Sequence, residues 1–182
     1  MLKSIFGKKK YLPDAYYKNI NEIDWEAIKV LGYRLILVDA DNTIIIHGNR
    51  EKTPFSKTAL KRIADAGLKM AILSNASAKR AEALGLALGV DAVGMANKPG
   101  TKGIHRASAK YDVPVEQIIL VGDQYFTDML AGRNAGCRTI LVDPLTDDEP
   151  WYIKLKRWQE GRVYRCLDRK SYYDKLPDVS SI

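Results

Sequence analysis

Two aspartates one residue apart carry the strongest chemical signal in this sequence. Asp39 and Asp41 directly follow the short run at residues 34–38 (RLILV), which is typical of a strand buried on both faces. Together with a third acidic residue, Asp123, they would repel one another unless a positive group lay between them. A hard cation meets that need, and no cysteine or histidine is placed to join the ligands, so oxygen ligation favours magnesium. We therefore expect an Mg²⁺ site.

Phosphoryl transfer is a reaction that such residues can support. It needs a nucleophile, neutralisation of charge, and donors for the phosphoryl oxygens. Asp39 could attack phosphorus and form an aspartyl-phosphate, and Asp41 could protonate the leaving oxygen and then deprotonate the attacking water. The Ser74 hydroxyl and the neighbouring Asn75 amide could donate to the phosphoryl oxygens, and Lys98 could supply the balancing positive charge.

The elements between these residues indicate how they meet. Apolar or β-branched runs predict strands at residues 34–38, 70–73, 92–95, 117–121 and 139–142. Helices are expected after the candidate caps Thr53 and Ser77, and at residues 101–110 and 128–135. This alternation predicts the α/β class, a three-layer, Rossmann-like, doubly wound and mostly parallel sheet. Ligands bind beyond the carboxyl ends of the strands of such sheets, so the polar residues there should converge.

In this order, the segments resemble the four motifs of the haloacid dehalogenase (HAD) superfamily of phosphatases. Residues 39–43 (DADNT) are similar to the first motif, 73–75 (LSN) to the second, Lys98 to the third, and 122–128 (GDQYFTD) to the fourth. The resemblance covers about residues 33–143 and implies a HAD-like fold.

The resemblance also implies roles for single residues. Asp39 would be nucleophile and metal ligand, and Asp41 the general acid/base, which binds the metal through its backbone carbonyl. Asp123 would complete the protein ligands of the metal. Asp128 and Thr43 would support these ligands, and Asp128 could also bind the metal through water. A plain helix cap stays open for Asp128, and a plain turn for Ser74 and Asn75.

The chain has little room for a cap domain over the site. Only residues 44–52 separate the first motif from the next expected helix, which is enough for a short flap. In an open site the substrate itself must help to exclude water. This favours a large substrate such as a phosphoprotein, a nucleic-acid end or a lipid headgroup. The missing cap, the Asp-Asn-Thr ending, the fourth motif and Leu12-Pro13-Asp14 resemble the YqeG-type subfamily. That resemblance implies action on phosphatidylglycerophosphate, in phospholipid biosynthesis.

Composition sets the broad frame. With 182 residues, 46% of them hydrophobic, we expect one core at residues 33–145, a basic leader and helix at 1–32, and a basic extension at 146–182. Two distant cysteines fit a reducing cytoplasm, and no window is long and apolar enough to span a membrane. The net charge is +7, with excess positive charge near both ends. These ends could be merely solvated, or could bind RNA or an anionic membrane.

If the subfamily resemblance holds, the ends would dock on the inner face of the membrane. The residues expected to do so are Phe6, residues 8–10, Trp151, Trp158 and the basic tail. Other readings are a phosphatase for soluble, protein or nucleic-acid phosphates, and a noncatalytic module serving a ribosome or GTPase partner. A phosphate receiver domain fits poorly, because its aspartate would follow the third strand, which ends near Asn97 without one. His47 and His105 match no motif and are expected to be surface or loop residues.

Overall fold

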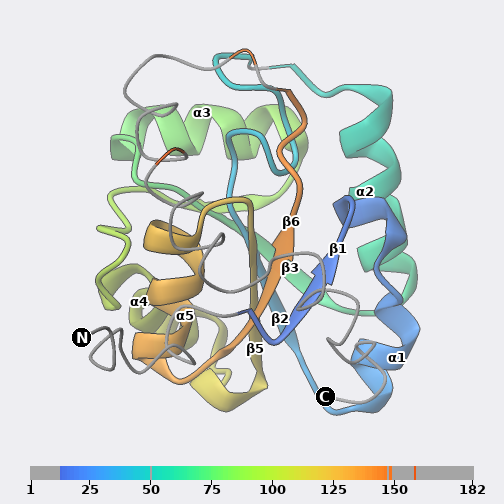
Figure 1. The fold of residues 1–182 in the computed structure, drawn as a ribbon, viewed down its shortest axis with the longest axis vertical. Coiled ribbons are helices and arrows are strands. Elements are labelled where there is room, and N and C mark those ends of the chain that lie inside the picture. Colours follow the sequence, from blue (N-terminus) through green and yellow to red (C-terminus); the bar gives the residue numbers. More distant parts are fainter. Residues whose placement is uncertain (1–12, 50, 147, 149–157, 159–182) are drawn as a thin grey trace, which may run out of the picture.

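The computed structural model describes residues 13–49, 51–146, 148 and 158. They form a six-stranded sheet in the order β1-β6-β5-β2-β3-β4, in which every neighbouring pair is parallel (Figure 1). The strands are β1 (Ala15–Tyr17), β2 (Leu35–Val38), β3 (Lys69–Leu73), β4 (Asp91–Val93), β5 (Ile118–Gly122) and β6 (Arg138–Val142). The predicted α/β class with a parallel sheet is confirmed.

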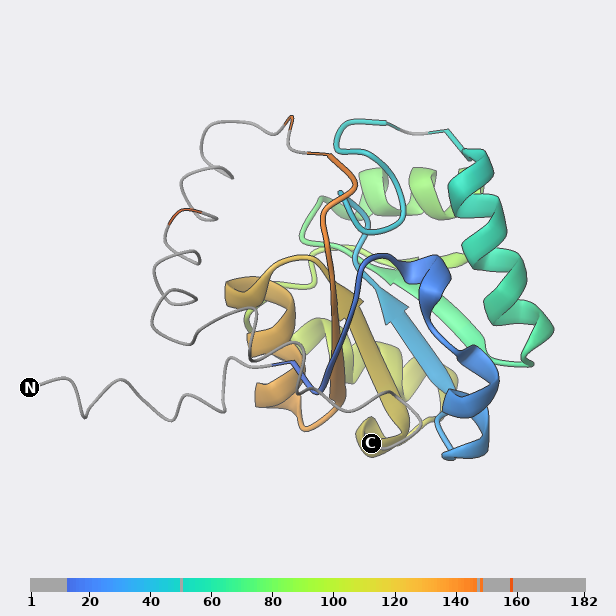
Figure 2. The ribbon, with the colours of Figure 1, turned by 45° about the vertical axis from the view of Figure 1, so that its right-hand side comes forward.

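Helices cover both faces of the sheet, which makes three layers (Figures 1 and 2). The helices are α1 (Trp25–Val30), α2 (Pro54–Asp65), α3 (Ala78–Leu88), α4 (Lys102–Tyr111) and α5 (Leu130–Ala135). Ile36 and Val38 of β2 pack in the cluster that contains residues of α1, α2 and α3. Leu35 and Leu37 pack in the cluster that contains residues of α4 and α5. Successive side chains of β2 thus point to opposite faces, and both faces are apolar because both are covered.

Two helix starts that the sequence predicts are confirmed. Thr53 caps α2 by accepting a hydrogen bond from the Ser56 N–H at 3.1 Å, while its own N–H donates to the Ser56 hydroxyl at 2.9 Å. Ser77 accepts from the N–H of Arg80 at the start of α3, which ends at Gly89 with φ of 75°. Gly89 suits that end because a left-handed conformation is easy for glycine. Both caps lie at the carboxyl edge of the sheet, from which the chain turns back.

The loop from β2 to α2 is short, so no cap domain lies between them. Asn42 adopts a left-handed conformation and closes this flap: its N–H donates to Ile45 O at 2.6 Å, and its side-chain oxygen accepts from the His47 N–H at 3.3 Å. The fourth predicted helix begins later than expected, because residues Tyr125–Met129 form a π-helical turn before α5.

One strand was not predicted. β1 pairs with β6 in parallel register, with Ala15 opposite Ile140, and Trp25 and Ile28 of the following segment belong to the main core. The predicted domain boundaries at residues 32 and 145 stay predictions. Phe6, residues 8–10, Trp151 and nearly all of the predicted extension lie outside the described residues. Among the helices that are described, none is long and apolar enough to cross a membrane.

Candidate active site

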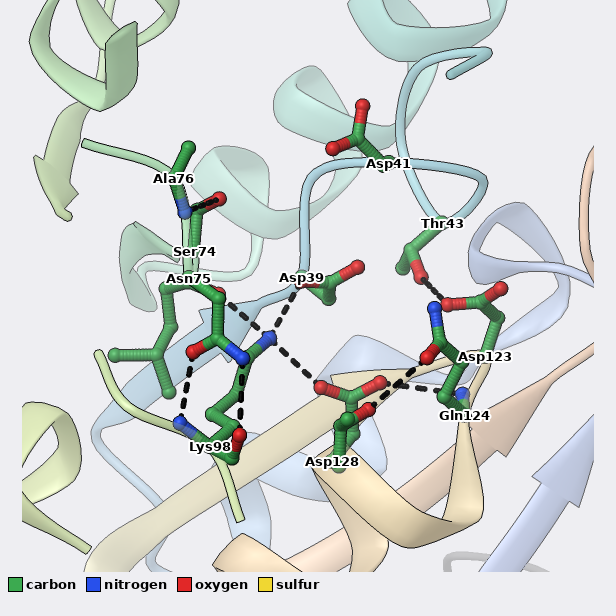
Figure 3. A network of polar contacts seen from close by, with 12 residues as sticks. Asp39, Asp41, Thr43, Ser74, Asn75, Ala76, Lys98, Asp123, Gln124 and Asp128 are labelled. Atoms are coloured by element: carbon green, nitrogen blue, oxygen red, sulfur yellow. Dashed lines mark hydrogen bonds and ion pairs between the residues drawn. The ribbon is translucent and has the colours of Figure 1, made fainter. Parts of the chain in front are cut away.

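Four segments bring the predicted site residues together at the carboxyl edge of the sheet (Figure 3). Val38 is in register with Val121 of β5 and with Ile72 of β3, so the residues that follow these strands are neighbours. This edge also contains the switch point of the sheet, because the chain proceeds from β2 to β3 on one side and returns through β5 on the other. Asp39, Ser74, Lys98, Asp123 and Asp128 are all buried there.

Three carboxylates share one small space. Oxygens of Asp39, Asp123 and Asp128 lie within 4.8 Å of one another. Asp128 is only 1% exposed, and it accepts a hydrogen bond from the N–H of Gln124 at 3.1 Å. This bond ties Asp128 back to the residue that precedes its own π-helical turn, and neither that turn nor α5 has a side-chain cap. The other oxygen of Asp128 faces Lys98. The structure thus places the Asp128 carboxylate beside those of Asp39 and Asp123.

One ammonium group faces this cluster. The Nζ of Lys98 lies 2.5 Å from Asp39 Oδ1 and 2.7 Å from Asp128 Oδ1, and it donates to Leu73 O at 2.8 Å. Burial alone would lower the pKa of Lys98, but Asp128 and Asp39 outweigh burial and raise it. Lys98 is therefore charged, and its single positive charge is shared between the carboxylates of Asp39 and Asp128.

Asp39 is a weaker acid in this site than an aspartate in water. Burial raises the pKa of Asp39 to about 7, with smaller contributions from the charges of Asp128 and Asp41, while Lys98 opposes the shift. A divalent cation would remove this conflict. The donors are oxygens only, which fits Mg²⁺, so Asp39, Asp123 and Asp128 would hold the ion through their carboxylates. The structure thus fits the metal that the sequence predicts without identifying it.

Asp41 lies apart from this cluster. Its carboxylate accepts from Nη2 of Arg80, at 3.1 Å for one oxygen and 3.2 Å for the other, and Nδ1 of His47 lies 3.4 Å from its Oδ1. A ligand role for Asp41 can thus only use its backbone carbonyl, as the family resemblance implies. His47 lies in the flap and His105 is exposed on α4, so both are loop or surface residues as expected. The contact of His47 with Asp41 was not predicted.

Ser74, Asn75 and Thr43 support the site in different ways. The Ser74 hydroxyl oxygen accepts from the Ala76 N–H at 3.1 Å, which leaves its proton to donate. The Asn75 side chain bonds both backbone groups of Lys98, accepting from its N–H at 2.7 Å and donating to its carbonyl at 2.9 Å. Thr43 donates to Asp123 Oδ1 at 3.3 Å. Asn75 therefore orients the backbone of Lys98, and its own backbone N–H and the second N–H of its side-chain amide are left as donors for a ligand.

Sequence reasoning missed two contributors to this site besides His47. Arg80 sits in the first turn of α3, where nothing in its local pattern points to Asp41. Gly122 lies under Asp128: a Cβ at this position would stand 2.5 Å from Asp128 Oδ2. A glycine at the end of a predicted strand, just before a motif carboxylate, was the only signal available for it.

Comparisons with known proteins find phosphatases similar to this chain. A family model described as HAD-hydrolase-like matches residues 95–148. The probable phosphatase YqeG of Bacillus subtilis is 32% identical over 91% of this chain and 96% of its own length. The chloroplastic phosphatidylglycerophosphate phosphatase 1 of Chlamydomonas reinhardtii is 32% identical, over 85% of this chain and 62% of its own. A related Arabidopsis thaliana phosphatidylglycerophosphate phosphatase is 26% identical, over 81% of this chain and 48% of its own.

This chain thus spans less than two thirds of the length of these two plant and algal relatives. Among solved structures, an uncharacterized protein from Listeria monocytogenes aligns with a TM-score of 0.52 at 14% identity, covering 64% of this chain and 85% of the other. That likeness concerns the fold alone.

Proposed function

This chain belongs to the YqeG-like phosphatases of the haloacid dehalogenase family, and we propose that it hydrolyses the terminal phosphate monoester of phosphatidylglycerophosphate. The reaction would depend on Mg²⁺ and proceed through an aspartyl-phosphate on Asp39. The observation that carries the proposal is the buried cluster in which Lys98 contacts Asp39 and Asp128. Burying these charged side chains lowers the free energy of unfolding. Such clusters are therefore expected at functional sites, where the chemistry requires them.

Asp39 is the proposed nucleophile. Lys98 holds one of its oxygens, so the carboxylate is fixed in one orientation before substrate arrives, and an oxygen of Asp39 attacks phosphorus as the bond to the leaving oxygen breaks. Mg²⁺, held by the neighbouring carboxylates, would neutralise charge on Asp39 and on the phosphoryl group. The same ion would keep Asp39 ionised at neutral pH despite its burial.

Asp41 is the proposed general acid and base. Its side chain is 24% exposed, so an alcohol can leave and water can enter beside it. It gives a proton to the leaving oxygen and then takes one from the water that hydrolyses the aspartyl-phosphate. Donors for the phosphoryl oxygens would be the Ser74 hydroxyl and the Asn75 N–H, with Lys98 supplying positive charge.

Phosphatidylglycerophosphate is the proposed substrate for two reasons. Two of the relatives bear the name of that activity. The site also has no cap domain between β2 and α2, so a headgroup at the surface of a bilayer could reach Asp39. The net charge of +7 favours an anionic membrane as the neighbouring surface. We accordingly expect a cytoplasmic enzyme that works at the inner face of the membrane.

Phosphate release from phosphatidylglycerophosphate in mixed micelles tests this proposal, beside p-nitrophenyl phosphate as a small ester. We expect lipid turnover that needs Mg²⁺ and stops with EDTA. Asp39→Asn should lower turnover of both substrates by at least about 10³-fold. Asp65→Asn removes a carboxylate at the exposed end of α2 and is the matched control. Turnover of the small ester alone would remove the lipid assignment, and activity that survives in Asp39→Asn would overturn the nucleophile.

A further inference from the structure

Arg80 presents unused hydrogen-bond donors next to Asp41. Both of its contacts with Asp41 come from a single nitrogen, Nη2. In the described part of the chain, Nη1 and Nε have no acceptor, and the side chain is 43% exposed. A guanidinium has five N–H donors in a planar fork, so Arg80 can keep Asp41 and bind an anion from solvent at the same time.

The position of Arg80 is on the side from which the leaving group departs. In the proposed function Asp41 protonates the leaving oxygen, so the leaving alcohol must lie against the Asp41 carboxylate. Arg80 contacts that carboxylate, and therefore borders the leaving alcohol rather than the transferred phosphoryl group. The transferred phosphoryl group would instead lie near Lys98, whose buried Nζ contacts the nucleophile Asp39.

The surroundings of Arg80 also favour an anion. Lys79 and Arg80 both stand in the first turn of α3, which has no acidic residue. Cations are unfavourable at this end of a helix because the N-terminus carries partial positive charge, so a bound anion would stabilise both. Ser77, Lys79, Arg80 and Ala83 line a surface pocket, and Arg80 also contacts Asp41. The pocket gives an anionic group room to approach Arg80.

We propose that Arg80 binds a second anionic group of the substrate, a phosphodiester carried by the leaving alcohol, while it positions Asp41. This inference rests on the proposed function and adds to it a basis for discriminating between phosphate monoesters. A substrate with a monoester at one end of a glycerol unit and a diester at the other would place its monoester on Asp39 and its diester on Arg80. Monoesters without the second anion would lose that contact and bind more weakly.

The test compares two soluble monoesters, so that acyl chains play no part. Glycerophosphoglycerol phosphate carries the diester, and glycerol 3-phosphate lacks it. For the wild-type protein with Mg²⁺ we expect kcat/KM to favour the first about ten- to hundredfold, mainly through KM, as one charge-assisted contact allows. Glycerophosphoglycerol, which has the diester alone, should inhibit hydrolysis of p-nitrophenyl phosphate competitively.

Arg80→Gln separates anion binding from the positioning of Asp41. A misplaced Asp41 slows both substrates alike, so it leaves their ratio unchanged, whereas loss of the anion contact brings the ratio close to one and weakens inhibition by glycerophosphoglycerol. Arg80→Lys keeps the charge without the fork and should retain part of the preference. Arg34→Gln removes the same charge at the opposite end of β2, where Arg34 contacts Gln117, and should keep the full preference.

Each outcome has a definite meaning. A wild-type protein that turns over both monoesters equally, or an Arg80→Gln variant that keeps the preference, overturns this inference and leaves the proposed function standing. A wild-type protein that hydrolyses no phosphate ester overturns both. Loss of the preference in Arg34→Gln as well would assign it to overall charge rather than to Arg80.

Discussion

Lys98 organises the site at the scale of single residues, and several neighbours serve to hold it. Asn75 fixes its backbone through two hydrogen bonds, and Asp39, Asp128 and Leu73 O surround its Nζ. A lysine side chain has four rotatable bonds, so these contacts remove most of its conformational freedom before substrate binds. The orientation of Asp39 thus depends on Lys98 and on the neighbours that hold Lys98 in place.

Substitution of Gly122 should lower kcat strongly, although Gly122 has no side chain to take part in the reaction. Gly122→Ala would place a methyl group against Asp128, forcing that carboxylate away from Lys98. We expect kcat to fall by about 10²-fold or more, because a small displacement in a preorganised site is costly. Turnover should be measured per folded molecule, with circular dichroism to follow folding.

Gly132→Ala is the matched control for this change. Its new methyl group would also meet side chains, Thr139 and Cys137, but these lie in the core beneath α5 rather than at the carboxylates. It should lower the free energy of unfolding while the folded fraction keeps its kcat. An equal loss of kcat in both variants would show that Gly122 matters only for folding.

At the scale of elements, Asp14 fastens the edge strand β1 to the sheet. Its carboxylate accepts from the N–H and hydroxyl of Thr139, both at 2.9 Å, and it pairs with Arg133 at 2.9 Å and Arg138 at 3.0 Å. Only 6% of this side chain is exposed, whereas both arginines reach solvent. The bonds to Thr139 should therefore carry most of the stabilisation.

Asp14→Ala is expected to lower the free energy of unfolding by about 2–3 kcal/mol, because a buried charge-assisted set of hydrogen bonds is lost. Urea unfolding in saturating Mg²⁺ measures it. Asp65→Asn, which breaks the exposed pair with Lys61, should cost at most about 0.5 kcal/mol. Equal losses for the two variants would mean that Asp14 is no more than a surface charge.

The sequence predicted elements whose signal is local and missed those whose signal is not. The core strands β2 and β5 are apolar throughout, and Thr53 and Ser77 mark helix starts by residue type alone. β1 has only three residues and no alternating pattern, so what makes it a strand is its pairing with β6, far along the chain.

The same distinction holds for the site. Asp39, Ser74 and Asp123 were predictable as neighbours because parallel strands bring their carboxyl ends to one edge of the sheet. Arg80 and His47 reach Asp41 by side-chain geometry from a helix and a flap, and no periodicity encodes such a contact. The Asn75 side-chain amide bonds the backbone of Lys98 rather than a ligand, and this too depends on where the Lys98 backbone lies.

At the scale of the whole molecule, the site opposes folding whenever no cation is bound. Asp39, Asp123 and Asp128 bring three carboxylates together in a buried space, where Lys98 shares one positive charge between Asp39 and Asp128. Burying excess like charge destabilises the folded state relative to the solvated chain. The rest of the fold must offset that cost, and magnesium would remove part of it by binding only the folded form.

The metal-free protein should therefore lose stability as the pH rises. The pKa of Asp39 is about 7 in the folded protein, against about 4 for an aspartate in an unfolded chain. Folding thus takes up a proton between these values, so the contribution of Asp39 is fully present below about pH 4 and is lost as the pH rises toward 7. Other carboxylates titrate in the same range, so the comparison must isolate Asp39.

Asp39→Asn supplies that comparison, because the amide never ionises. In EDTA, we expect the variant to match the wild type near pH 4 and to become more stable by on the order of a few kcal/mol by pH 7.5, measured by urea unfolding at each pH. Saturating Mg²⁺ at pH 7.5 should stabilise the wild type more than the variant and narrow the gap. A difference that stays flat with pH would mean that Asp39 ionises as freely in the folded protein as in water, and would remove the electrostatic argument for a cation at this site.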